Sequence, residues 1–204
     1  MAAGLSGVAG FVDAVGFIHL GGYFVSFMSG NSTRAGAVLA NGSWLGFGLA
    51  MGLVGAFLAG VISASLLRRM VPRRKRLAVL LYIAAVLSAA ALMSDGGLWL
   101  PLVAPMMAFA MGAENVVFER DGEVSIGLTY MTGTLVKMGQ RIATALAGGD
   151  RLGWLRYFGL WLALTVGSIL GGLAYHALNL NALWLSVLGV LAAILWSRRI
   201  PGHT

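Results

Sequence analysis

Residues 44–67 read WLGFGLAMGLVGAFLAGVISASLL and contain no Lys, Arg, Asp or Glu. At about 1.5 Å per residue, a helix of this length extends over roughly 36 Å, which is enough to cross the hydrocarbon core of a bilayer. The stretch therefore predicts a membrane-spanning helix. Further stretches with at most one charged residue each predict five more spans, namely residues 3–20, 77–94, 98–118, 153–178 and 181–198.

The composition of the whole chain is typical of a polytopic membrane protein. Of its 204 residues, 59% are hydrophobic and 10% are charged, whereas soluble domains average about 45–50% and about 25%. These values exclude an ordinary soluble globule, and they exclude a disordered chain because disorder requires low hydrophobicity. The pairs Gly48/Gly52 and Gly167/Gly171 form close-packing faces that serve either the interior or a homodimer.

Several kinds of chemistry are excluded by the residues that are missing. The chain contains no Cys, so it has no disulfide and no thiol nucleophile. His19, His176 and His203 lie far apart in the sequence and lack the spacing of metal ligands. A glycine-rich phosphate-binding loop is also missing. We therefore expect no metal and no cofactor.

Basic residues mark one loop. Six of the 14 Lys and Arg residues lie between Arg68 and Arg76, in a run flanked by two apolar stretches. Because cytoplasmic loops of membrane proteins are enriched in Lys and Arg, this run predicts the cytoplasmic side and contact with anionic lipid head groups. A nucleic-acid partner is not expected, since its binding surface would spread basic and aromatic residues over a folded domain. The charged residues of 119–123 predict a solvated polar loop.

Two stretches, 22–42 and 124–148, differ from ordinary membrane helices. Each begins with an extended-looking run of β-branched or aromatic residues, reaches a small polar turn, and continues as a short helical pattern that contains a basic residue. The turns read MSGN at residues 28–31 and MTGT at residues 131–134. They predict helix breaks, which are tolerated at membrane depth only where protein or a polar cavity surrounds them.

An internal repeat connects the two turns, which match each other at an offset of 103 residues. At nearly the same offset, 102, Asp13 corresponds to Asn115. Further along, residues 54–60 match residues 166–172 at an offset of 112, and one longer loop in the second half explains the drift. The two halves of the chain therefore resemble copies of one unit.

We expect a single all-α polytopic domain over residues 1–204, built from repeat one, 1–95, and repeat two, 96–204. Each repeat holds three full spans and one break, and an odd number of spans inverts the second repeat. If segments 22–42 and 124–148 are re-entrant, every cluster of basic residues falls in the cytoplasm together with both termini. If both segments cross the membrane, two of these clusters fall outside. The re-entrant arrangement is therefore preferred.

A polar site is predicted where the broken segments meet. The short helices that begin near Gly30 and Gly133 leave unpaired N–H groups and a positive dipole end, which suits an anion or the polar end of a small solute. Neighbouring polar side chains either bind such a ligand or only cap the helices. The candidate binding residues are Asp13, Ser29, Gly30, Asn31, Thr33, Arg34, Glu114, Asn115, Thr132, Gly133, Thr134 and Lys137.

Two acidic residues lie inside predicted spans, Asp13 in the first and Glu114 in the fourth. Because a charge near the bilayer centre costs at least about 2.5–3.5 kcal/mol, such a residue usually has a partner or a function. One interpretation is a structural ion pair with Arg34, Lys137 or Arg141. The other is a carboxylate that couples transport to protons or gates the solute. The sequence leaves both open.

Three motifs stand out along the chain: FVDAVGF at residues 11–17, FMSGNST at 27–33 and GLTYMTGTLV at 127–136. They resemble the YoaK-like family of uncharacterised bacterial inner-membrane proteins, which contain a domain of unknown function. The resemblance covers nearly the whole chain, although Ser29 stands where members usually have Thr and Glu114 where they often have Gln. It implies an integral protein of the bacterial inner membrane and brings no substrate with it.

These features favour a membrane permease, either a secondary transporter or a channel, for a small solute with anions as the favoured class. A non-transporting scaffold or lipid-interacting protein is the first alternative, because the chain has few polar residues and a basic loop. A membrane-embedded hydrolase built on Asp13, His19 and Ser29 has weaker support, because the second half has no matching His.

Overall fold

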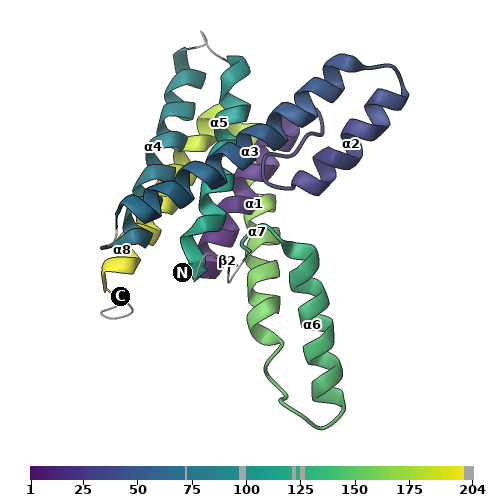
Figure 1. Cartoon of the computed structure of the whole chain (residues 1–204), viewed down its shortest axis with the longest axis vertical. Helices are drawn as coiled ribbons and strands as arrows, with labels where there is room; N and C mark the ends of the chain where they lie inside the picture. Colours follow the sequence, from purple (N-terminus) through teal and green to yellow (C-terminus); the bar gives the residue numbers. More distant parts are fainter. Residues whose placement is uncertain (72, 97–99, 121–122, 125–126, 200–204) are drawn as a thin grey trace.

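The computed structural model describes the whole chain except residues 72, 97–99, 121–122, 125–126 and 200–204. The described residues are mostly helical, as predicted (Figure 1). The α-helices are α1 (Ala2–His19), α2 (Met28–Ala40), α3 (Trp44–Met70), α4 (Lys75–Gly96), α5 (Leu100–Asn115), α6 (Met131–Leu146), α7 (Leu155–Leu178) and α8 (Leu183–Arg199). The 3-10 turns η1 (Val116–Phe118) and η2 (Asn179–Ala182) and a short antiparallel ladder, β1 (Glu119–Arg120) with β2 (Glu123–Val124), complete the described structure.

Five stretches of the described chain are long and apolar enough to cross a membrane. They are α1, α3, α4, α5 with η1, and a stretch of 43 residues, Leu155–Ser197, that contains both α7 and α8. The six stretches predicted from charge positions coincide with these helices to within a few residues. Asn179 ends α7 because its backbone takes a positive φ (53°), which a helix cannot continue through, at the polar break that the sequence indicates.

Two long helix pairs form the centre of the bundle. α1 packs along α7 and against α8, while α5 packs along α3 and against α4. Both pairs approach closely through glycine, since Gly10 lies against the backbone of Leu164 and Gly112 against that of Phe57. A Cβ atom at either glycine would collide with that backbone, so a larger residue would separate the helices. The predicted close-packing face at Gly167 packs on α1 in the same way.

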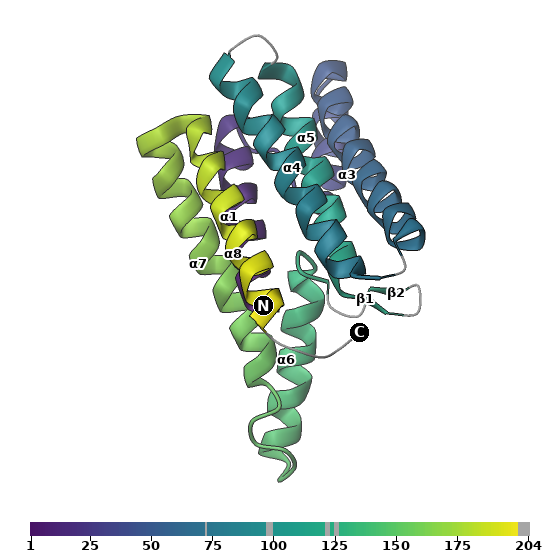
Figure 2. The ribbon, with the colours of Figure 1, turned by 90° about the vertical axis from the view of Figure 1, so that its left-hand side faces the viewer.

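The two ends of the bundle differ in charge. Figure 2 shows that α1 begins and α8 ends at one end, where the connection from α3 to α4 and the β1–β2 ladder also lie. The basic run that begins at Arg68 is at this end. The end of α4 and η2 lie at the opposite end, where the Trp184 indole nitrogen donates a hydrogen bond to Asp95 (3.1 Å) and links α8 to α4.

Two helical hairpins project from the bundle in different directions (Figure 1). In the first, α2 packs on α3, and in the second, α6 packs on α7. Figure 1 shows α2 and α6 well apart, each running away from the central helices. The loop residues that precede each short helix contact α1, Val25 through Asp13 and Leu128 through Ser6. These contacts place both breaks inside the bundle and direct the short helices outward.

Candidate functional site

Asp13 of α1 holds the loop residues that precede α2. Its carboxylate oxygen Oδ1 accepts hydrogen bonds from the backbone N–H groups of Val25 (2.8 Å) and Ser26 (2.7 Å). Val25 is fully buried and packs so closely on Gly16 that a Cβ atom there would collide with its side chain. Because these N–H groups lie outside the helices and away from water, they need a side-chain acceptor. Asp13 is that acceptor and anchors the first break.

Two more side chains close the loop at the first break. The buried Asn31 amide bonds both backbone groups of Phe24, accepting from its N–H (2.9 Å) and donating to its carbonyl (2.6 Å). The Arg34 guanidinium donates to the carbonyl of Gly21 (3.0 Å) and lies 4.2 Å from the centre of the Tyr23 ring. Both predicted site residues are therefore engaged with the protein itself.

Asn115, at the end of α5, holds the second break in a related way. Its Oδ1 accepts from the backbone N–H of Thr129 (3.4 Å), and its Nδ2 donates to the Thr129 hydroxyl (3.0 Å) and to the carbonyl of Met111 (3.0 Å). The Ser6 hydroxyl of α1 donates to the carbonyl of Leu128 (3.2 Å). The loop residues before α6 are thus fixed to both α1 and α5.

Of the two interpretations of the polar turns, the one in which their side chains cap the short helices is wrong. Within the described chain, no side chain accepts a hydrogen bond at the start of α2 or α6. Aromatic rings cover those turns instead, since Phe27 lies over Gly30 and Tyr130 over Gly133, and a Cβ atom at either glycine would collide with the ring. The N–H groups of both first turns therefore keep the positive end of the helix dipole without a side-chain acceptor.

The predicted hydroxyl residues have separate environments. Thr134 is buried and donates to the carbonyl of Tyr130, four residues earlier (3.1 Å). Ser29, Thr33 and Thr132 are exposed. Neighbouring positions of a helix point in different directions, so a polar cluster in the sequence does not form a cluster in space. The structure therefore does not bring these three residues together with the two anchors.

A cavity of about 670 Å³ lies beside the second break, between α6, the start of α7 and the first residues of α1. Gly133, Thr134 and Lys137 line it from α6, and Arg156 and Tyr157 line it from α7. Among the described residues, none of the first break lines this cavity, so it is not the predicted site at which the two broken segments meet. Both basic side chains are exposed, so the cavity is accessible from outside. Its volume falls within the range of about 300–1,000 Å³ that is typical of small-molecule sites. The two cations and the uncapped start of α6 make it suitable for a negatively charged ligand.

Glu114 lies next to Asn115 in the sequence but does not share its contacts. The side chain is fully buried, and neither carboxylate oxygen has a hydrogen-bond partner within the described part of the chain. It does not line the cavity beside the second break. Burial of a polar group without a hydrogen bond costs free energy, so Glu114 lowers the stability of the bundle as it stands.

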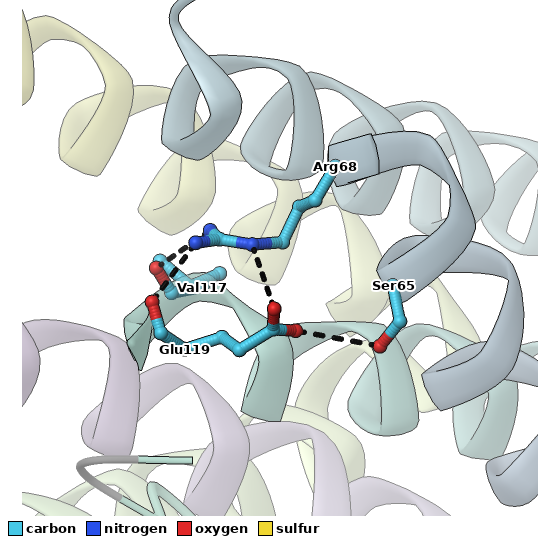
Figure 3. Close-up of polar contacts among 4 residues, drawn as sticks. All are labelled: Ser65, Arg68, Val117 and Glu119. Carbon is cyan, nitrogen blue, oxygen red and sulfur yellow. Dashed lines mark hydrogen bonds and ion pairs between the residues drawn. The ribbon is translucent and has the colours of Figure 1, made fainter. Parts of the chain in front are cut away.

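The ion pair that the described residues form lies outside both breaks (Figure 3). Arg68 Nε lies 3.8 Å from the carboxylate of Glu119, and Arg68 Nη2 donates to the Glu119 backbone carbonyl (2.9 Å). Ser65 of α3 adds a 3.5 Å hydrogen bond to the same carboxylate. Glu119 therefore packs against α3, and the prediction that it belongs to a solvated loop is wrong. α3 and α5 end side by side, which residue types alone do not reveal.

Asp13 has no ion-pair partner among the described residues. The interpretation of Asp13 as one half of a structural ion pair with Arg34, Lys137 or Arg141 is therefore wrong. Two backbone N–H groups take the place of the cation, because hydrogen bonds to a carboxylate are stronger than those between neutral groups. Every residue except proline has a backbone N–H group, so the residue types could not indicate which N–H groups bond to Asp13.

Three residues at the breaks were not anticipated: Ser6, Thr129 and Arg156. Each carries a weak signal in the sequence. Ser6 is a polar residue within an apolar span, and Arg156 is a single charge at the start of another. Thr129 stands 103 positions after Ser26, so the repeat offset relates two residues whose backbone N–H groups bond to the anchors.

Comparison with known proteins identifies the family. Residues 1–196 match the family described as "Protein of unknown function (DUF1275)". The chain is also similar to the UPF0700 transmembrane protein RA0705 of Rhizobium meliloti (strain 1021), with 34% identity over 205 residues that cover 98% of this chain and 86% of the relative. No solved structure matches the chain. The chain therefore belongs to this family and is a multi-pass membrane protein, which confirms the resemblance seen in its motifs.

Proposed function

We propose that this member of the family is a permease, either a secondary transporter or a channel, for a small anionic solute. The observation that carries the proposal is the cavity beside the second break, because it brings the uncapped start of α6 together with Lys137 and Arg156. A helix N-terminus and two cations favour an anion over a neutral or cationic solute. Sites next to interrupted helices within a polytopic bundle are typical of transporters.

Two inverted repeats, residues 1–95 and 96–204, are part of this proposal. The packing of α1 on α7 and α8 corresponds to the packing of α5 on α3 and α4 when the halves are exchanged. Asp13 and Asn115 each hold loop residues that precede a short helix. Such matching contacts support a pseudo-twofold relation between the halves.

The same contacts favour a different alignment of α3 with α7. Gly60 lies against the backbone of Phe109, and Gly167 lies against that of Gly7. Phe109 and Gly7 are related by the offset of 102 that relates the two anchors, so Gly60 pairs with Gly167 at an offset of 107. The match at an offset of 112 is thus displaced along the helix, because runs of Gly and Ala align with each other in several registers.

We further propose a bacterial inner membrane with both termini in the cytoplasm. α1 begins and α8 ends at the end of the bundle that carries the basic run from Arg68 to Arg76 (Figure 2), and such runs favour the cytoplasmic side. The broken segments 22–42 and 124–148 are then re-entrant, one from each side, in keeping with the different directions of the two hairpins. Exposed residues of the basic run are available to anionic lipid head groups.

The hydrolase alternative has less support from the geometry. His19 Nδ1 lies 3.3 Å from the Tyr175 hydroxyl, Asp13 bonds to backbone N–H groups, and Ser29 is exposed. A nucleophile and its base need to lie within hydrogen-bond reach of each other. These three residues have different partners, so the arrangement favours a permease over a hydrolase.

Anion flux in proteoliposomes tests the proposal. Vesicles that contain the purified protein and valinomycin are placed in the potassium salts of acetate, nitrate or phosphate, and their swelling is followed by light scattering. We expect at least one salt to cause faster swelling than in protein-free vesicles. Lys137→Gln should slow this swelling, whereas Arg69→Gln, which changes an exposed basic residue away from the cavity, should not. Swelling equal to that of protein-free vesicles in every salt would count against a permease.

A further inference from the structure

An apolar groove adjoins the cavity beside the second break. It has a volume of about 410 Å³ and lies between α1, α7 and α8. Ala3 lines both spaces, so the two are neighbours. The hydroxyl of Ser186, the polar side chain among the described residues of the lining, donates to the carbonyl of Leu183 in its own helix (2.6 Å). The rest of the lining is apolar and includes Gly4, Gly7, Phe11, Ala163, Gly167 and Leu170.

The shape and lining of the groove suit an alkyl chain. Along α1 the groove extends from Ala3 to Phe11, a distance of roughly 12 Å at about 1.5 Å per residue. Gly4 leaves room beside α1, since a Cβ atom there would meet no other atom within 4 Å, whereas Gly7 and Gly167 bring the backbones of α1 and α7 into contact at the floor of the groove. An alkyl chain in this groove would bury apolar surface without displacing a hydrogen bond of the protein.

The cavity supplies the opposite, charged end of a ligand site. Lys137 and Arg156 line it from two different helices. The Arg156 guanidinium is oriented by a 2.6 Å hydrogen bond to the Tyr157 hydroxyl, and neither cation has an acidic partner among the described residues. Lysine and arginine side chains of this kind bind carboxylate or phosphate groups. The charge therefore selects an anionic head group.

We propose that the cavity and the groove form one site for an anionic amphiphile that enters from the surrounding bilayer. Its carboxylate or phosphate head lies between Lys137 and Arg156, and a single alkyl chain lies along α1. A small anion would leave the groove empty, and a neutral lipid would leave both cations without a partner. This inference goes beyond the proposed small-anion permease, and it rests on that function only in taking the cavity as the site.

Photolabelling tests the site directly. The purified full chain is reconstituted into phosphatidylcholine nanodiscs and exposed to a fatty acid that carries a diazirine near the end of its chain, and labelled peptides are identified by mass spectrometry. We expect the label to concentrate on peptides of α1 and α7. Decanoate should compete with the label far more strongly than acetate, which has only the head, or decanol, which has only the tail.

Substitutions test the site of the head group and the groove for the alkyl chain separately. Lys137→Gln combined with Arg156→Gln should weaken competition by decanoate by about tenfold or more, because charge-assisted hydrogen bonds to the head are lost. Gly4→Phe should fill the groove and remove most of the labelling, since its ring enters open space. Gly55→Phe is the matched control, because it adds the same ring to open space on α3, outside the groove, and it should label like the unaltered protein.

Several outcomes would overturn the proposal. Label spread evenly over the membrane helices, including α3, would indicate ordinary contact with bilayer lipid. Equal competition by decanoate and acetate would indicate a small-anion site, and equal competition by decanoate and decanol would indicate a groove without head-group selection. The small-anion permease is judged separately. Site-specific labelling without flux of acetate, nitrate or phosphate would retain the amphiphile site and count against the small-anion permease. Flux of these anions without site-specific labelling would retain the permease and overturn the amphiphile site.

Discussion

At the first helix break, the Asp13 carboxylate accepts hydrogen bonds from two backbone N–H groups, at 2.8 and 2.7 Å. At the second, the Asn115 amide accepts from one backbone N–H, at 3.4 Å. The aromatic covers differ as well. Phe27, which covers the first turn, is 39% exposed and packs edge-on against Phe24, whereas Tyr130, which covers the second, is 68% exposed.

The difference between the breaks indicates different roles. The first has a charged anchor, a buried Asn31 that closes the loop, and Arg34 bonded across it to Gly21. The second has a neutral anchor and a more exposed ring, and it adjoins the cavity lined by Lys137 and Arg156. We therefore expect the first break to serve as a rigid support and the second to admit a ligand. Each prediction below tests one part of this contrast.

The largest effect is expected at the charged anchor. Asp13→Ala removes the acceptor of two N–H groups, and because each hydrogen bond to a charged group contributes about 1.5–3 kcal/mol, the free energy of unfolding should fall by about 3–5 kcal/mol. Asn115→Ala should cost only about 1–2 kcal/mol, because its bonds are to neutral groups and the one to the N–H is long. Unfolding titrated with SDS in mixed micelles measures both. Equal losses would remove the distinction between the anchors.

The second largest effect is expected at Arg68, which holds the chain after α5, and it is compared with Arg34, which holds the chain after α1. Arg68 donates to the carbonyls of Glu119 (2.9 Å) and Val117 (3.4 Å), whereas Arg34 donates to that of Gly21 alone. Arg68→Ala should therefore lower the free energy of unfolding by about 2–4 kcal/mol, and Arg34→Ala by about 1–2 kcal/mol. Glu119→Gln keeps the backbone bonds of Arg68 and should cost under about 1 kcal/mol. If Glu119→Gln lowered the free energy of unfolding as much as Arg68→Ala, the ion pair and not the backbone bonds would provide the stabilisation.

The sequence predicted the position of the helices and of both breaks because these depend on residue type. A long uncharged run such as 44–67 indicates a span wherever it packs, and the repeated turns at 28–31 and 131–134 interrupt the apolar pattern in the same way. The helices begin and end within a few residues of the predicted limits. The family resemblance added a second, independent reason to expect a membrane protein.

The roles of individual site residues could not be predicted, because they depend on packing. One of the two interpretations gave Asp13 a cation as its partner, but backbone N–H groups bond to it. Glu119 was expected in solvent, but Arg68 reaches it because α3 and α5 end together. Arg156 lines the cavity only because α7 begins beside α6, a tertiary contact between segments that no local pattern relates.

The glycines under the aromatic rings provide a smaller test of rigidity. Gly30→Ala forces a Cβ atom against Phe27, and since overpacking costs about 1–3 kcal/mol while Ala favours a helix over Gly by about 1 kcal/mol, a net loss of about 1–2 kcal/mol is expected. Gly133→Ala should be nearly neutral, because the exposed Tyr130 ring can rotate away.

Matched controls for this pair lie on the same helices. Gly36 of α2 and Gly139 of α6 have no atom within 4 Å of an added Cβ atom. Gly36→Ala and Gly139→Ala should each raise the free energy of unfolding by up to about 1 kcal/mol through helix propensity alone. If Gly133→Ala lowered the free energy of unfolding as much as Gly30→Ala, both breaks would be equally rigid. The expectation that the second break admits a ligand would then fail.

The smallest effect, of opposite sign, is expected at Glu114, next to the neutral anchor. The repeat offset of 102 relates it to Val12, which is also fully buried. Because neither carboxylate oxygen has a partner among the described residues, Glu114→Met should raise the free energy of unfolding by about 1 kcal/mol by replacing an unsatisfied polar group with an apolar one. Glu114→Gln, which retains polarity, should not. A different outcome would be a Glu114→Met protein with unchanged free energy of unfolding but without anion flux in proteoliposomes. The buried carboxyl group would then take part in transport. In that case both breaks would need an acidic residue, Asp13 at the first and Glu114 at the second.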